Sequence, residues 1–265
     1  MSFPATSDSR LSTASPTRNR SGGGPTPGRV NPRRHGVYEP ADQGPDQGRS
    51  RARRAAEACE AGRHEVATME YLVTMTTHVP EATPDELVDD VRGREAGRSR
   101  ELAAQGHLLR LWRPPLRPGE WRTLGLFAAA DDGQLEEVLA SMPLRVWRTD
   151  EVTALSPHPN DPGLAAGALG SEFLTRFVIV VPEGTPAKVV EETEAQEAAR
   201  AKELAGQGRL RRLWTLSGRG RALGLWQAAG STEIQAILRS LPLDPWMTVQ
   251  TTPLTPHPSD PAGRS

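Results

Sequence analysis

The stretch MEYLVTMTTHVPEATPDELV, residues 69–88, opens with a run of apolar and β-branched residues that a proline ends. This pattern is typical of a β-strand. The polar residues that follow favour a helix, with Thr83 as its N-cap and Pro84 at its first position. We expect this helix to end at Gly106, because glycine is the usual residue just past a helix C-terminus.

The next fifty residues continue with strand, turn and helix patterns. HLLRLWR and WRTLGLFAAA are predicted as two strands joined by the turn PPLRPGE, DDGQLEEVLASM as a short helix, and LRVWRTDEVTAL as a last strand. The predicted order is therefore β-α-β-β-α-β, which is the ferredoxin-like unit.

The same pattern of strands and helices then occurs a second time along the chain. MEYLVTMTTHVPEATPDELV matches SEFLTRFVIVVPEGTPAKVV at an offset of 102, and the closing PHPND matches PHPSD at an offset of 99. Such self-similarity predicts two structural repeats. We place them at 69–162 and 171–261, joined by the small-residue linker 163–170.

The repeat also suggests how the two units pack. A four-stranded antiparallel sheet with both helices on one face leaves its other face bare, and a bare apolar face is seldom tolerated. Two such sheets can cover each other. We therefore expect an α+β fold in which two tandem ferredoxin-like βαββαβ units form a dimeric-type barrel within one chain, as an intramolecular pseudo-dimer. Further homo-oligomerisation stays open.

Residues 1–68 lack hydrophobic periodicity and are rich in Arg, Gly and Pro, with 11 Arg against 7 Asp and Glu. They are predicted to form a disordered tail, because they cannot bury enough apolar surface to offset the entropy of ordering. The run RSRARR at 49–54 is compatible with a nucleic-acid or membrane tether, although a solvated tail is commoner for such runs. A further interpretation is that the native start is Met69.

Composition narrows the classes of function. The single cysteine, Cys59, excludes an intrachain disulfide, a thiolate metal cage and a CxxC motif, and fits the cytoplasm. No run approaches the ~20 apolar residues of a membrane span, and a net charge of −1 gives no reason to expect nucleic acid. The nucleotide-binding and nucleophile motifs are absent, and the histidines lack metal-ligand spacing. We expect no cofactor, no metal and no membrane partner.

Each long helix carries charge within its apolar stripe. At 100° per residue one face holds, in the two repeats, Leu87, Val91, Glu95, Arg98 and Leu102, and Val189, Thr193, Glu197, Arg200 and Leu204. One interpretation is a salt bridge between Glu and Arg on the helix flank. The other is a polar cluster that lines a cavity between helix and sheet, with the glutamate as base and the arginine as anion clamp.

His158 and His257 each stand between two prolines near the end of a repeat. They are either surface histidines in a stiff segment or imidazoles at the rim of the barrel that exchange a proton near neutral pH. We expect all six tryptophans to lie in strands and to form core or pocket wall: Trp112, Trp121, Trp147, Trp214, Trp226 and Trp246. Of these, Trp112, Trp214 and Trp246 are the candidates for substrate binding.

The run EAGRSRELAAQGHLLRLWR, with the later SMPL and LSPHPND, resembles the muconolactone Δ-isomerase family. The end of the second repeat, LPLDPWM with LTPHPSD, resembles the family more closely than the end of the first. The resemblance covers both units. It implies a ferredoxin-like fold, no cofactor, and a double-bond shift in an unsaturated lactone of aromatic catabolism.

The resemblance also implies roles for residues. It places Glu95 and Glu197 on the family's helix glutamate, Arg113 on the arginine after the tryptophan, and His158 and His257 on the His-Pro tail. Such chemistry needs a base for a proton γ to the carbonyl, donors for the dienolate oxygen, and a cation for the substrate carboxylate.

The two copies depart from the family pattern at three places, one of which is the aromatic-and-proline close of the family, which reads LRVW in the first copy. Thr215 replaces Arg113 in the second copy, and Thr123 and Ala222 stand where the family has an asparagine.

Three functions follow as hypotheses. The first is cofactor-free isomerisation of an unsaturated lactone or a related small carboxylic acid. The second is a non-catalytic ligand-binding or assembly module on the same barrel. The third is a small-molecule monooxygenase, which ranks last because no residue marks an oxygen-activating site.

Overall fold

The computed structural model describes residues 68–163 and 170–264. The predictions made for the tail and for most of the linker lie outside the described residues, as does Cys59. All contacts reported below lie within one compact unit, Arg63–Ser265.

Both repeats have the predicted order β-α-β-β-α-β, so this prediction is confirmed. The first repeat contains β1 (Met69–Thr77), α2 (Asp85–Ala104), β2 (Leu108–Arg113), β3 (Arg122–Ala129), α3 (Asp132–Ala140), a short 3-10 helix η1 (Pro143–Trp147) and β4 (Arg148–Pro157). The second contains β5 (Ser171–Ile179), α4 (Ala187–Gly206), β6 (Leu210–Thr215), β7 (Arg221–Ala228), α5 (Ser231–Arg239), η2 (Asp244–Trp246) and β8 (Met247–Pro256), followed by η3 (Pro261–Arg264).

Two details of the first repeat differ from the prediction. Thr83 is not the N-cap: Pro84 holds that place in extended backbone, and α2 starts at Asp85. The last strand does not begin at Leu144, because Pro143, whose ring fixes φ, starts the 3-10 helix η1 there. The predicted helix end is confirmed, since Gly106 has φ of 79° directly after the last turn.

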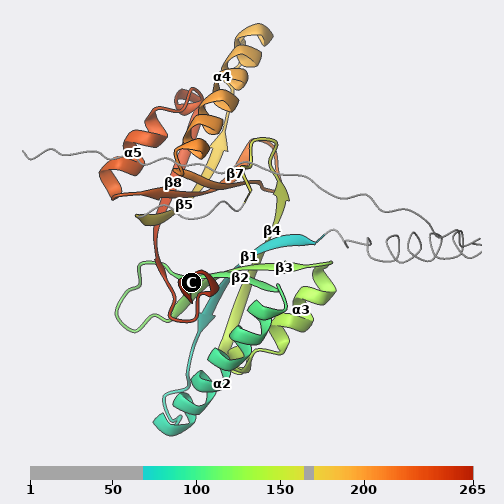
Figure 1. The fold of residues 1–265 in the computed structure, drawn as a ribbon, viewed down its shortest axis with the longest axis vertical. Coiled ribbons are helices and arrows are strands. Elements are labelled where there is room, and N and C mark those ends of the chain that lie inside the picture. Colours follow the sequence, from blue (N-terminus) through green and yellow to red (C-terminus); the bar gives the residue numbers. More distant parts are fainter. Residues whose placement is uncertain (1–67, 164–169, 265) are drawn as a thin grey trace, which may run out of the picture. The chain divides into compact units, whose positions relative to one another are not determined.

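The eight strands form one closed barrel in the order β1-β3-β2-β8-β5-β7-β6-β4, and every pairing given is antiparallel. Each repeat contributes a four-stranded sheet. Short pairings of β2 with β8 and of β4 with β6 join the two sheets at their edges. Helices α2 and α3 pack on the first sheet, and α4 and α5 on the second, as Figure 1 shows. The expected barrel is therefore confirmed.

Three apolar cores follow from the alternation of side chains along the strands. Tyr71, Val73 and Met75 face the helices of the first repeat, whereas Leu72 between them faces the other sheet. The core between the two sheets also contains Trp112 and Trp214, each 1% exposed. Covering both sheets in this way removes the bare faces that the sequence predicted.

Buried ion clusters hold the two repeats together near the two junctions between their sheets. Arg110 of β2 donates to both oxygens of Glu172 on β5, at 2.9 and 2.6 Å, and to Asp260 near the C-terminus. The indole N–H of Trp112 donates to the same Glu172 at 2.7 Å. The cations and carboxylates satisfy one another, which buried charges require.

The other junction repeats this cluster with equivalent residues. Arg212 pairs with Glu70 and Asp161, and Trp214 donates to Glu70 at 2.6 Å. The guanidinium groups of Arg110 and Arg212 also lie over the rings of the neighbouring tryptophans, at 4.8 and 4.7 Å from the ring centres. None of the helices in the described part of the chain is long and apolar enough to cross a bilayer.

Candidate functional site

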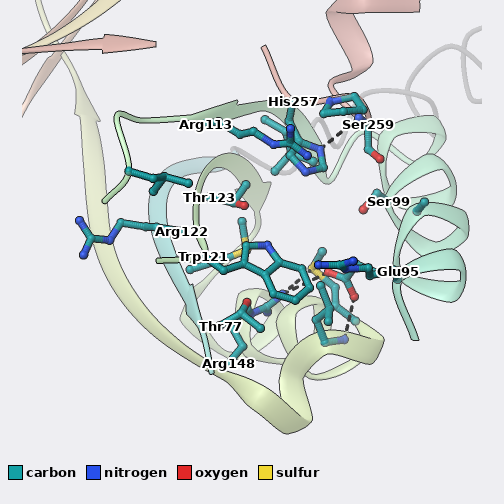
Figure 2. A pocket seen from close by; sticks show the side chains of 18 of the residues that line it. Thr77, Glu95, Ser99, Arg113, Trp121, Arg122, Thr123, Arg148, His257 and Ser259 are labelled. Carbon is teal, nitrogen blue, oxygen red and sulfur yellow. Dashed lines mark hydrogen bonds and ion pairs between the residues drawn. The ribbon is translucent and has the colours of Figure 1, made fainter. Parts of the chain in front are cut away.

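A cavity of about 670 Å³ lies between α2 and the helix-facing side of the first sheet. Its walls come from β1, α2, β2, β3, η1, the start of β4 and the loop before β3, and from the C-terminal tail of the second repeat. Polar and charged side chains in the wall include Thr77, Arg92, Glu95, Ser99, Arg113, Glu120, Arg122, Thr123, Arg148, His257 and Ser259. We call this cavity the first pocket; Figure 2 shows it from close by.

The carboxylate of Glu95 is the buried acid of the first pocket, with its side chain 13% exposed. Its Oε2 accepts a hydrogen bond from the Leu144 backbone N–H at 2.9 Å, and its Oε1 accepts one from Arg148 at 3.3 Å. Burial raises the pKa of Glu95 above its ordinary value, while the Leu144 hydrogen bond and the Arg148 charge act in the opposite direction. Glu95 is therefore a positioned carboxylate whose pKa is higher than that of a carboxylate in water.

Local structure explains both partners of Glu95. Pro143 starts the 3-10 turn η1, whose first N–H groups have no partner within the turn, so the Leu144 N–H is free to face the helix. Arg148 is the first residue of β4, and its side chain is 2% exposed. Asp150, two residues along the same strand, binds Arg148 with both carboxylate oxygens at 2.6 and 2.9 Å, which fixes the guanidinium.

Three more arginines line the first pocket. Arg113, at the end of β2, is exposed, and within the described part of the chain no ion pair or hydrogen bond of its guanidinium is found. Arg92 lies over the ring of Trp121, at 4.5 Å from the ring centre. Arg122 extends away from the cavity (Figure 2). Arg113 is therefore the cation best placed to meet an anionic group of a ligand.

His257 reaches the first pocket from the second repeat. Its Nδ1 accepts a hydrogen bond from the Ser259 backbone N–H at 3.1 Å, so the neutral ring carries its proton on Nε2. Burial and the nearby charge of Arg113 lower the pKa of His257 to about 4. The imidazole is thus neutral near pH 7 and available as a hydrogen-bond donor (Figure 2).

Asp260 anchors the tail that carries His257. Its Oδ1 accepts the Leu111 backbone N–H at 3.0 Å, while its carboxylate pairs with Arg110. The His257 backbone N–H donates to the Leu111 carbonyl at 3.0 Å. The ion cluster at this junction therefore also positions a side chain of the pocket.

The equivalent cavity of the second repeat, here the second pocket, measures about 370 Å³. The tail that closes it comes from the first repeat and carries His158. The Nδ1 of His158 accepts the Asn160 N–H at 3.1 Å, and burial lowers the pKa of this histidine. Glu197 accepts the Leu243 N–H at 3.0 Å, and burial raises its pKa. Met247 replaces Arg148 beside it, and most of the wall is apolar.

The structure corrects the expected pairing on the long helices. Arg98 does not pair with Glu95 but with Glu101 and Ser141, at 2.9 Å each, outside the first pocket. Arg200 likewise binds Glu203 and Ser240 outside the second pocket. The arginine side chain extends along the helix surface toward the next turn, whereas the glutamate turns inward to the strand. The two glutamates therefore line cavities, as one interpretation expected, whereas neither expected Glu–Arg salt bridge forms and both arginines lie outside the pockets.

The tryptophans named as candidates for substrate binding do not line either pocket. Trp112 and Trp214 face the core between the sheets, because their positions alternate with those of the helix-facing residues. Trp246 lies in the 3-10 helix η2 rather than in a strand. Trp121 and Trp226, which the sequence predicted only as core or pocket wall, line the pockets.

The sequence pattern does not identify the residues that position Glu95 and His257. It predicts Arg148 and Asp150 only as part of a strand, and Asp260 only as part of a tail. The signal available was the acidic residue that both tails share, as PHPND and PHPSD. Within the described residues no group of three or more His, Cys, Asp or Glu could hold a metal ion.

Comparison with known proteins identifies relatives of both repeats. A family model described as muconolactone delta-isomerase matches residues 69–161 and 171–260. The muconolactone delta-isomerase of Rhodococcus opacus is 33% identical over 88 residues, which is 33% of this chain and 95% of that protein. Muconolactone delta-isomerase 1 of Acinetobacter lwoffii is 31% identical over 92 residues, 35% of this chain and 93% of that protein.

Solved structures give a similar result. The crystal structure of muconolactone isomerase matches with 27% identity and a TM-score of 0.31, over 33% of this chain and 92% of that chain. A variant of chlorite dismutase from Candidatus Nitrospira defluvii matches with 10% identity and a TM-score of 0.51, over 74% of this chain and 95% of that chain. At this identity the likeness concerns the fold alone.

Proposed function

This chain belongs to the muconolactone delta-isomerase family, and from that premise we propose that its first pocket catalyses a cofactor-free proton shift in an unsaturated lactone or a related small carboxylic acid of aromatic catabolism. The observation that carries the proposal is the environment of Glu95. A buried carboxylate, kept in place by Leu144 and Arg148, faces a polar cavity that also holds Arg113 and the neutral His257.

Glu95 is the candidate base. It would take a proton from the carbon γ to the lactone carbonyl, and the C–H electron pair would move toward the carbonyl oxygen as a dienolate. The same carboxyl group would then return the proton to the α-carbon, so that the double bond moves from the α,β to the β,γ position. The raised pKa of Glu95 supports this role, because a stronger base lowers the barrier to removing a carbon-bound proton.

Arg113 and His257 are candidates for binding and polarising the substrate. The guanidinium of Arg113 suits a free carboxylate, since Arg binds carboxylates in bidentate fashion. The Nε2–H of His257 is a neutral donor that can hydrogen-bond developing negative charge on the dienolate oxygen. The hydroxyl groups of Thr77 and Ser99 in the same wall are further donors.

Ultraviolet absorbance of muconolactone mixed with the full chain tests the proposal. We expect turnover that Glu95→Gln reduces by about 10²- to 10⁴-fold, the usual contribution of a general base. Glu197→Gln is the matched control, because it makes the same change in the second pocket, and its turnover should stay near that of the unmodified protein.

Two results would overturn the proposal. One is the absence of any absorbance change with muconolactone and with related unsaturated lactones at high protein concentration. The other is turnover that survives Glu95→Gln. Deuterium from heavy water in the product adds a check, since a proton shift through an exchangeable carboxyl group admits solvent hydrogen.

A non-catalytic binding role is a second candidate, favoured for the second repeat by one observation. There Met247 replaces Arg148 and Thr215 replaces Arg113, so the cations that would serve an anionic substrate are gone while the cavity remains.

A further inference from the structure

The two pockets have opposite charge. Beside Arg122, whose side chain extends away, three arginines and two glutamates are among the residues that line the first pocket: Arg92, Arg113, Arg148, Glu95 and Glu120. Glu194 and Glu197 are the charged residues that line the second, and no Arg or Lys is among its described lining residues. The wall therefore changes from a net positive charge to a net negative one.

The change arises at equivalent positions of the repeat. Glu194 stands where the first repeat has Arg92, at the offset of 102, and Met247 stands where it has Arg148, at the offset of 99. Val249 likewise replaces Asp150. Both members of the supporting Arg–Asp pair are thus replaced together, and neither leaves an unpaired charge behind. The second pocket therefore differs from the first in its charge preference.

Apolar and aromatic groups form the rest of the second pocket. Phe177 and Trp226 meet edge to face, with ring centres 6.3 Å apart, and both line the cavity. The Trp226 indole N–H is already used, because it donates to Thr175 Oγ1 at 2.8 Å. Cavities of about 300–1,000 Å³ with apolar walls and a few polar groups are typical of small-molecule sites.

Glu197 is the polar group that a ligand in this cavity would meet. Its Oε2 accepts the Leu243 N–H, and in the described part of the chain no cation pairs with the carboxylate. A half-buried carboxylate without a counter-ion is less well solvated than one in water, and a bound cation would offset that loss. An anionic ligand would meet two carboxylates instead.

We propose that the second pocket binds a small protonated amine with an aromatic or otherwise apolar body. The ammonium group pairs with the free oxygen of Glu197, and the apolar body packs against Phe177 and Trp226 where they line the cavity; aromatic rings also attract cations. The chain then carries two sites of opposite charge preference that arose from one repeated unit. This site does not depend on whether the first pocket is catalytic.

Isothermal titration calorimetry with three probes that share a 2-phenylethyl body tests the charge preference. The probes are 2-phenylethylammonium, the neutral 2-phenylethanol and the anionic 3-phenylpropionate, added to the full chain at pH 7. We expect the ammonium probe to bind about tenfold or more tightly than the alcohol, the gain typical of a hydrogen bond between charged groups. The anion should bind the second pocket most weakly.

Variants locate the site and keep the test independent of activity. Glu197→Gln should bring the affinity of the ammonium probe down to that of the alcohol, whereas Glu95→Gln should leave it unchanged. Met247→Arg, which restores the residue of the first repeat, should abolish binding of the ammonium probe. Equal binding of ammonium and alcohol, preference for the anion in the second pocket, or no binding of any probe would each overturn the proposal.

Discussion

Arg148 Nη1 lies 3.3 Å from Glu95 Oε1, and this contact joins the first strand position after a 3-10 turn to the middle of a helix 53 residues earlier. Arg148 is fixed in turn by Asp150. In the second repeat Met247 and Val249 replace both supporting residues, and Glu197 keeps its hydrogen bond to backbone alone. This pair of strand residues is therefore one of the differences that separate the chemistry of the two pockets, beside Thr215 in place of Arg113 and Glu194 in place of Arg92.

The double substitution Arg148→Met with Asp150→Val should shift the pH dependence of activity. Arg148 lowers the pKa of Glu95 more than Asp150 raises it, so removing both should raise that pKa further. Because Glu95 would act as an ionised base, activity should rise with pH through its pKa, and the acid limb of kcat/KM should move to higher pH. Arg98→Met, outside the pocket, is the control, and an unmoved acid limb in the double variant would contradict this role.

Arg113→Thr should weaken substrate binding. The change copies Thr215 of the second repeat and removes the exposed guanidinium that is placed to meet a substrate carboxylate. We expect KM to rise about tenfold, with a smaller effect on kcat, because a hydrogen bond to a charged group contributes roughly 1.5–3 kcal/mol. Steady-state kinetics measure the change, and Thr215→Arg should leave both constants nearly unaltered. A fall in kcat alone would argue against a binding role.

Asp260→Asn should impair the first pocket through the tail it anchors. The amide keeps an acceptor for the Leu111 N–H but loses the ion pair with Arg110, so His257 should be held less firmly. We expect kcat/KM to fall about tenfold and stability to fall by about 1–3 kcal/mol. Asp161→Asn makes the same change at the other junction and should cost similar stability without lowering kcat/KM. Equal kinetic losses in both variants would show a general effect instead.

Arg110→Met should destabilise the closed barrel. Glu172 and Asp260 would remain buried without their cation, a situation that costs about 3–5 kcal/mol. Denaturant unfolding measures the loss. Arg94→Met provides the comparison, since Arg94 and Asp90 are 58% and 59% exposed and such pairs contribute about 1 kcal/mol or less. Similar losses in the two variants would mean that the buried cluster does not stabilise the barrel.

Glu197→Gln should raise the melting temperature at neutral pH. Burial raises the pKa of Glu197 in the folded chain above its unfolded value, so ionisation costs stability as pH rises above the unfolded pKa. The neutral amide avoids this cost. Below the ordinary carboxyl pKa both folded and unfolded chains are protonated, and the advantage of the variant should vanish. Thermal unfolding between pH 4 and 8 measures the difference, and a constant difference across this range would contradict the assignment.

Part of the candidate site was predictable from the sequence. Glu95 and Glu197 repeat at the same place in both helices, inside a stripe where apolar residues are expected, and both line cavities. The partners of Glu95 were not predictable in the same way. Helical spacing suggested Arg98, three residues on, but the two side chains diverge from the helix surface and Arg98 finds Glu101 instead.

The sequence by itself determined the two units, the order of their strands and helices, and the barrel that covers their apolar faces. Hydrophobic period and self-similarity can both be read along the chain without knowing which side chains meet. Tertiary structure decided which charges meet. Arg148 reaches Glu95 only after η1, which leads into β4, packs against α2, and His257 enters the pocket of the other repeat only after the barrel closes at β2 and β8. Those contacts depend on long-range packing of side chains, which no local pattern encodes.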